Sequence, residues 1–181
     1  PIAAQKASEY LDKCMSEGDS AGGIAECVIK GVPAGIGEPV FDKLDAVLGM
    51  AILSIGAVKG IEFGSGFAVS GMKGSENNDP FIAENGEVKK LTNNSGGILG
   101  GISDGSDIIF RAAFKPTPSI SKKQHTVNTA SENVEIEIKG RHDPIIVPRA
   151  IVIVEAMSAI ALTDMLFRSL PSQIDKIKAN Y

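Results

Sequence analysis

An arginine, a histidine and an aspartate stand side by side at Arg141, His142 and Asp143, directly before a proline. An arginine can bind a phosphate or carboxylate through two parallel hydrogen bonds, and an aspartate can accept a proton or hold a neighbouring group. An Arg–Asp pair that only fastens a turn explains the same residues equally well. A single histidine such as His142 is more often structural than catalytic. The cluster suggests anion binding or acid–base chemistry, and it leaves the structural alternative open.

A second group of polar side chains lies in the segment Lys115-Pro116-Thr117-Pro118-Ser119, directly after an expected strand. The two prolines favour an extended backbone, while the other three residues offer one positive charge and two hydroxyl groups. Such a segment could bind a phosphate or the edge of a flavin. It could equally be a turn that ends the strand, and alone it decides nothing.

Two glycine-rich segments, 18–23 and 93–103, complete the set of candidate clusters. Paired glycines allow a close approach of the backbone to a ligand, and successive N–H groups can form an anion-binding nest. The spacing in 93–103 matches neither the phosphate-binding loop nor the dinucleotide fingerprint, so spacing alone favours a flexible surface loop. Segment 18–23 is well explained as a helix stop and a turn. Together the four clusters favour an anionic ligand held by loops, and they name no reaction.

The elements that must position these clusters follow from the periodicity of the apolar residues. It predicts helices over 3–17, from about 39 to 52 and over 148–170, and strands over 24–30, 57–63, 108–114 and 134–138. This order predicts an α+β fold with an antiparallel or mixed sheet layered against long helices. The last helix is apolar on nearly all sides in its first half, which predicts burial between two layers.

A long glycine-rich region at about 64–106 shows little periodicity. A connection of that length inside a compact domain is usually functional or mobile. The chain has 181 residues, of which 43% are hydrophobic and 22% charged, and this predicts a single globular domain over 1–181.

Charge and cysteine content exclude several classes of partner. The formal net charge of −4 gives no general attraction for nucleic acid or an anionic membrane. Cys14 and Cys27 form neither a disulfide framework nor a zinc-site spacing, so no metal is expected and a reducing cytoplasm is favoured. The N-terminus enters an amphipathic pattern without a signal peptide. The most apolar stretch, 145–162, contains a proline and two charged residues, which favours a buried helix over a membrane span.

Seven short segments, taken together and in order, carry much more information than any one of them. They are 18–23, 37–45, 57–64, 74–79, 94–103, 115–120 and 140–144. On these residues the chain resembles the chorismate synthase family over nearly its whole length. The resemblance is to the C-terminal half of that family. The glycine-and-histidine motif and the arginine- and serine-rich flavin segment of the N-terminal half have no counterpart here.

The resemblance implies an activity for the parent enzyme. It would be a lyase of the shikimate pathway, in the biosynthesis of aromatic amino acids. It would convert 5-enolpyruvylshikimate 3-phosphate into chorismate and phosphate by a 1,4-anti elimination that uses reduced FMN. The family fold places helices between two antiparallel sheets, and this chain would supply half of that β-α-β sandwich. The family is commonly a cytoplasmic homotetramer, and this chain without its N-terminal half is expected to be inactive.

Carried over residue by residue, the resemblance implies FMN-binding positions. Gly56 and Ala57 match a backbone pair that contacts the cofactor, although the match is weakest at Gly56. Gly100 matches a glycine that approaches the flavin. The segment from Lys115 to Ser119 (Lys115, Pro116, Thr117, Pro118 and Ser119) matches a stretch that wraps it, and Arg141 matches an arginine beside it.

One catalytic position is implied as well. Asp143 matches the aspartate near N5 of the flavin ring, which is thought to help move a proton. The histidines credited with acid chemistry belong to the absent half, so His142 is not put in their place. Two alternatives for the chain by itself are a non-catalytic module that binds a flavin or phospho-ligand, and an assembly half that binds nothing alone.

Overall fold

A central strand, β7 (Ile108–Phe114), organises the fold. The computed structural model describes residues 2–140, 142–170 and 174–179. It lies between β1 (Gly23–Ile29) and β2 (Val58–Phe63) and is antiparallel to both. Alternate side chains of β7 are buried, as expected for a strand with one covered face. They are Ile108, Phe110, Ala112 and Phe114.

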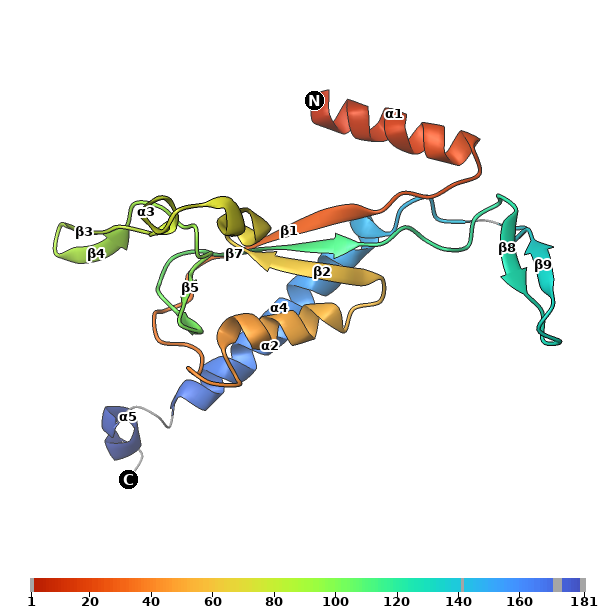
Figure 1. The fold of residues 1–181 in the computed structure, drawn as a ribbon. Helices are drawn as coiled ribbons and strands as arrows, with labels where there is room; N and C mark the ends of the chain where they lie inside the picture. Colours follow the sequence, from red (N-terminus) through yellow and green to blue (C-terminus); the bar gives the residue numbers. More distant parts are fainter. Residues whose placement is uncertain (1, 141, 171–173, 180–181) are drawn as a thin grey trace.

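Two helices cover one face of this sheet, α2 (Leu44–Leu53) and α4 (Val147–Ser169) (Figure 1). The apolar stripe of α2 is fully buried and consists of Leu44, Leu48 and Ile52 at helical spacing. Phe110 lies in one core cluster with Ile52 and with Val154 of α4. The fold is therefore α+β, with an antiparallel sheet layered against two helices.

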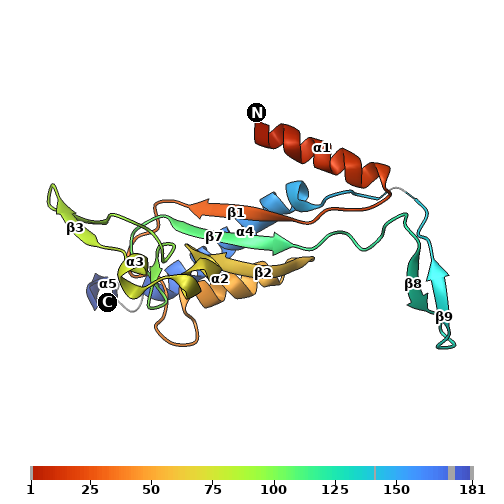
Figure 2. The ribbon, with the colours of Figure 1, turned by 45° about the horizontal axis from the view of Figure 1, so that its top comes forward.

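The remaining elements surround this core. They are α1 (Ile2–Ser16), the short 3-10 helix η1 (Gly66–Gly71), α3 (Gly74–Asn77), the hairpins β3 (Phe81–Glu84)–β4 (Glu87–Lys90), β5 (Ile98–Leu99)–β6 (Ile102–Ser103) and β8 (Gln124–Val127)–β9 (Asn133–Ile136), and α5 (Ile174–Ala179). Helix α1 and the hairpins β3–β4 and β8–β9 extend from the body in different directions (Figure 2).

Most predicted boundaries are confirmed. The strand 108–114 is found as predicted, and the helices 3–17 and 148–170 and the strands 24–30 and 57–63 lie within one residue of their observed bounds. The region 64–106 contains short ordered elements, from η1 to β6, that its weak periodicity did not indicate.

The predicted helix start near Pro39 is wrong. Helix α2 begins at Leu44, whose backbone N–H donates to the carbonyl of Gly101 at 2.8 Å. Phe41 has a φ of 61°, which is incompatible with a right-handed helix, so the chain turns here. Val40, which lies within the predicted helix, is exposed.

The strand predicted over 134–138 is observed as β9, which ends at Ile136 and pairs with β8. Apolar and charged residues alternate from Val134 to Ile138, yet all four residues of β9 are exposed. The hairpin projects from the body, so no second layer covers either of its faces (Figure 1).

Helix α4 is buried along one stripe, not on all sides. The buried residues recur at intervals of three or four: Val147, Ala150, Val154, Ser158, Ala161, Met165 and Ser169. Ile151, Val152, Ile153 and Ile160 on the same helix are exposed. By length and composition α4 could also cross a bilayer. The buried stripe of α4, packed against the sheet, is typical of a core helix. The predicted β-α-β sandwich has a sheet on each side of its helices, and the described residues supply one of these two sheets.

Candidate functional site

Four segments that are distant in the sequence meet where β1 begins and β7 ends, and we call them the sheet-end cluster. They are 18–23, 56–57, 115–119 and 142–145. Three hydrogen bonds join them: Lys115 N to Ala57 O at 2.9 Å, Ser20 Oγ to Thr117 O at 2.7 Å, and Ala21 N to Pro144 O at 2.7 Å. The structure thus brings together most of the residues that the sequence predicts for one site.

The chain leaves the sheet at this point for a local reason. Pro116 and Pro118 have no N–H, so the ladder that β7 forms with its neighbours cannot continue past Lys115. Ala57, which links α2 to β2, has a φ of 70° and is a turn residue rather than the strand start that the sequence predicted.

Two polar groups of the cluster remain available for a ligand. The Thr117 hydroxyl oxygen is buried and has no hydrogen-bond partner in the described part of the chain. Lys115 is half-buried, and no carboxylate within residues 2–140, 142–170 and 174–179 pairs with it. A buried polar atom without a partner is rare in native proteins, which makes this segment a candidate binding surface.

The Asp143 end of the cluster is only partly described. The Asp143 carboxylate accepts a hydrogen bond from Arg149 at 2.7 Å. Asp143 therefore does form the kind of Arg–Asp pair that can fasten a turn, and its partner in this pair is Arg149. Arg141 lies outside the described residues. His142 Nε2 donates to the Ile138 carbonyl at 2.9 Å, which agrees with a structural histidine.

Gly100 is not brought to the cluster. It lies in the β5–β6 turn, beside the N-terminus of α2, because Leu44 N donates to Gly101 O. Ala57 follows the other end of α2, and ten helical residues span about 15 Å. A ligand that contacted both Gly100 and Lys115 of one chain would therefore have to extend along α2. Gly100 has a φ of 61°, and no described atom beyond its two chain neighbours lies within 4 Å of the place where a Cβ would be.

A buried ionic network in the region 64–106 was missed by sequence reasoning. The Lys90 ammonium contacts Asp104 at 2.6 Å, Asp79 at 3.3 Å, Asn93 Oδ1 at 3.1 Å and Ser95 Oγ at 3.4 Å. The side chains of Lys90, Asp79 and Asp104 are 2%, 3% and 7% exposed. Asp79 lies in a recognised motif, but nothing in the pair Lys89-Lys90 signals that its second lysine is buried.

Both carboxylates of this network are held in the charged form. Burial raises the pKa of Asp79, but hydrogen bonds from the hydroxyls of Ser95 and Thr92 and from two backbone N–H groups outweigh burial and lower it well below its usual range. Burial likewise raises the pKa of Asp104, and the hydrogen bond from Lys90 leads the contributions that lower it overall.

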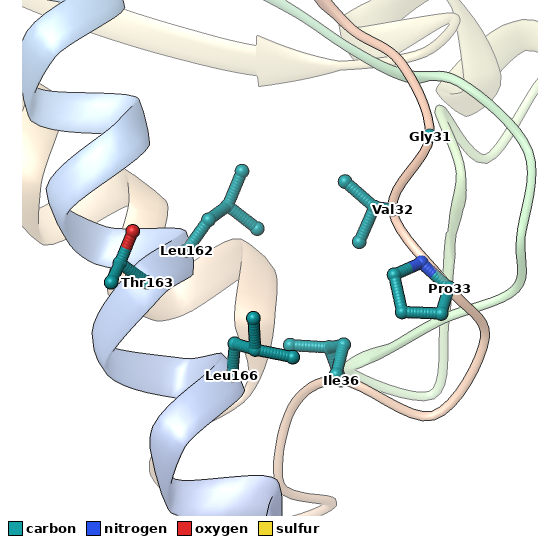
Figure 3. Close-up of a pocket in the computed structure, with 7 residues that line it drawn as sticks. All are labelled: Gly31, Val32, Pro33, Ile36, Leu162, Thr163 and Leu166. Carbon is teal, nitrogen blue, oxygen red and sulfur yellow. The ribbon is translucent and has the colours of Figure 1, made fainter.

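A separate crevice lies between the chain after β1 and helix α4 (Figure 3). It has a volume of about 170 Å³ and is lined by residues 31–33, Ile36, Leu162, Thr163 and Leu166. Its lining carries one hydroxyl and no charge, so it does not suit the anionic ligand that the sequence favours. No group of three metal-ligating side chains occurs among the described residues.

Comparison with known proteins decides the family. The sequence model of the chorismate synthase family matches residues 1–167. The chain belongs to the chorismate synthase family. Its similarity to individual chorismate synthases is high: it is 64% identical to the curated chorismate synthase of Lachnoclostridium phytofermentans over 180 residues, which is 99% of this chain and 49% of that protein.

Archaeal chorismate synthases are nearly as similar. The protein of Methanosarcina mazei is 58% identical over 170 residues, which covers 93% of this chain and 47% of the relative. A solved structure described as "Crystal Structure of Chorismate Synthase" has a TM-score of 0.75 and 30% identity, over 97% of this chain and 46% of that chain. The chain thus spans about half the length of the curated chorismate synthases it matches, which agrees with the predicted C-terminal half.

Proposed function

We propose that this chain is the C-terminal half of a chorismate synthase, folded as one domain. The complete enzyme eliminates phosphate from 5-enolpyruvylshikimate 3-phosphate to form chorismate, with reduced FMN as its cofactor. The observation that carries this proposal is the 64% identity to a curated chorismate synthase over 99% of the chain.

The residues carried over by resemblance suit a flavin phosphate cofactor. The buried Thr117 hydroxyl lacks a partner within the described residues, and open space adjoins both Gly56 and Gly100. We assign to FMN the positions Gly56, Ala57, Gly100, Lys115 to Ser119 and Arg141. The positive charge of Lys115, which has no counter-ion among the described residues, attracts the negatively charged phosphate. The hydroxyl of Thr117 supplies a hydrogen bond.

The positions assigned above would hold reduced FMN, which would supply transient electron donation to an elimination without net redox change. The part of this chain is orientation and proton handling. Asp143 is the residue we assign to a proton near the cofactor, because it lies in the sheet-end cluster and, among the described residues, its carboxylate pairs with Arg149 at the surface.

We further propose that the missing half covers the outer side of α4. Ile151, Val152, Ile153 and Ile160 leave that side apolar and exposed, and a second sheet packed on it would complete a β-α-β sandwich. The missing half would also supply most cations for a polyanionic substrate, since this chain has a net charge of −4. We expect the complete enzyme to be a cytoplasmic homotetramer.

Chorismate formation under anaerobic conditions, from 5-enolpyruvylshikimate 3-phosphate and reduced FMN, tests the proposal. The assay is run on this chain alone and on its mixture with a separately produced N-terminal half. Activity in the mixture alone supports both the reaction and the division of the site between halves. Activity of the chain alone contradicts the role given to the missing half. Inactivity of a folded and associated mixture contradicts the catalytic proposal.

A further inference from the structure

The segment that we assign to FMN has almost no backbone support of its own. Lys115 N donates to Ala57 O, and the next backbone N–H along the chain that bonds to a main-chain carbonyl in the described residues is that of Ser121, two residues past the segment. Pro116 and Pro118 cannot donate at all. The conformation between these points must therefore be held from outside the segment.

The loop 18–22 supplies that support. The hydroxyl of Ser20 donates to the Thr117 carbonyl at 2.7 Å, and the carbonyl of Gly18 accepts from Ser121 N at 3.0 Å. A side chain at position 22 would lie 2.6 Å from the Phe114 carbonyl, so only glycine allows the loop to run this close to the end of β7.

Asp19 orients the serine. One of its carboxylate oxygens accepts from the backbone N–H of Ser20 at 2.9 Å, and the other accepts from the ammonium of Lys122 at 2.7 Å. The hydrogen bond from Lys122, followed by that from Ser20, lowers the pKa of Asp19, so the carboxylate stays charged as an acceptor. Asp19 thus connects the loop 18–22 to Lys122, which follows the FMN segment in the sequence.

The bond to Thr117 has a direct consequence for its side chain. Ser20 fixes the peptide plane of Thr117 through its carbonyl, and this sets the direction in which the Thr117 side chain, with its buried hydroxyl that has no partner in the described residues, leaves the backbone. A preorganised hydroxyl binds a ligand without a further loss of conformational entropy.

We propose that Ser20, oriented by Asp19, is a positioning residue that holds Lys115–Ser119 in the conformation that binds FMN. The inference rests on the proposed function, since it takes the FMN assignment of that segment as given. Neither residue contacts the cofactor in this proposal. Their effect is transmitted through the Thr117 carbonyl.

The test uses the complete enzyme, formed by this chain and the half that it lacks, and compares Ser20→Ala with Ser20→Thr. FMN affinity is measured by flavin fluorescence, and the thermal midpoint is measured without FMN. Ser20→Ala should weaken FMN binding about tenfold, the value of one hydrogen bond, while Ser20→Thr retains the hydroxyl and most of the affinity. Asp19→Asn should weaken binding less than Ser20→Ala.

Ser70→Ala is the matched control, because Ser70 also donates to a carbonyl, that of Phe67 at 2.9 Å, outside the cluster. A change in thermal midpoint no larger than that of the control, with weakened FMN binding, supports the positioning role. Unchanged FMN affinity in Ser20→Ala overturns it, as does an affinity loss matched by a general loss of stability. If the wild-type enzyme itself bound no FMN, the proposed function would fail first.

Discussion

Two polar regions of this chain differ in how their charges are satisfied. Around Lys90, every charged group has a partner: the ammonium faces two carboxylates, and these accept further hydrogen bonds from hydroxyl and backbone groups. In the sheet-end cluster, Lys115 has no counter-ion and the Thr117 hydroxyl no partner among the described residues.

The difference separates stability from binding. When all groups of a buried network pair with one another, none is available to bind a ligand. Removal of one group leaves its partners buried and unpaired, which lowers the free energy of unfolding. Open polar groups contribute little to stability and can receive a ligand. We therefore expect substitutions around Lys90 to change unfolding and substitutions in the sheet-end cluster to change FMN binding or turnover.

The largest effect is expected from Asp143→Ala in the complete enzyme. Loss of a group that moves a proton should lower turnover about 10²–10⁴-fold, while the thermal midpoint stays nearly unchanged because the carboxylate is at the surface. Arg149→Ala is the control, since it breaks the same ion pair and keeps the carboxylate. Wild-type turnover in Asp143→Ala would remove this residue from the mechanism.

Lys90→Met should destabilise the complete protein strongly. It leaves Asp79 and Asp104 buried without their cation, a change that typically costs about 3–5 kcal/mol. Lys89→Met, one residue earlier, breaks only exposed pairs with Glu84 and Glu87 and should cost ~0.5 kcal/mol or less. Urea unfolding measures the free energy of unfolding of both variants. If Lys90→Met lowered it no more than Lys89→Met, the network would not be important for stability.

Acid should weaken the same network. The folded-state pKa of Asp79 lies below the unfolded value of about 3.9, so its contribution to stability is present above that pH and is lost as the pH falls through the folded pKa. Urea midpoints between pH 6 and pH 2.5 should fall steeply below about pH 4. In Asp79→Asn the midpoint should be lower at neutral pH and depend less on acid. Parallel pH curves for the two proteins would contradict this assignment.

Lys115→Met should have the smallest effect, and it should appear in binding rather than folding. Loss of one charge opposite a phosphate weakens affinity about tenfold or somewhat more. Titration of FMN into the complete enzyme measures this, with Lys123→Met as control, because Lys123 forms a surface pair with Glu135. A fall in thermal midpoint without a change in affinity would place Lys115 in the structural class with Lys90.

Local patterns were enough to predict the main elements. The nearly continuous apolar run from Ile108 to Phe114 was enough to predict β7, whose alternate side chains are buried. The alternation of apolar and charged residues from Val134 to Ile138 predicted a strand but not its surroundings, and β9 is exposed in the projecting hairpin. The backbone turn at Phe41, which delays the start of α2, has no signature in the residue types.

The candidate site was predictable only as far as family motifs reach. The segments around Lys115 and Asp143 stood out by their residue types, the family motifs supplied their expected roles, and the structure brings them together. The separation of Gly100 from Lys115 depends on where α2 lies, which no motif encodes. Lys90 was missed because its partners Asp79 and Asp104 come from other segments, and a lysine beside another lysine looks solvated.

The central place of β7 also dictates the order in which the chain can fold during synthesis. β1 pairs Gly23 with Phe114 and Ile29 with Ile108, so it has no partner strand until the ribosome has added about eighty more residues, roughly 4–16 s at about 5–20 residues per second. β2 waits for the same strand. Meanwhile the Lys90 network can close as soon as Asp104 has been added. During this interval β1 is an unpaired edge open to other chains, and aggregation of nascent protein should respond to the speed at which residues 30–114 are translated.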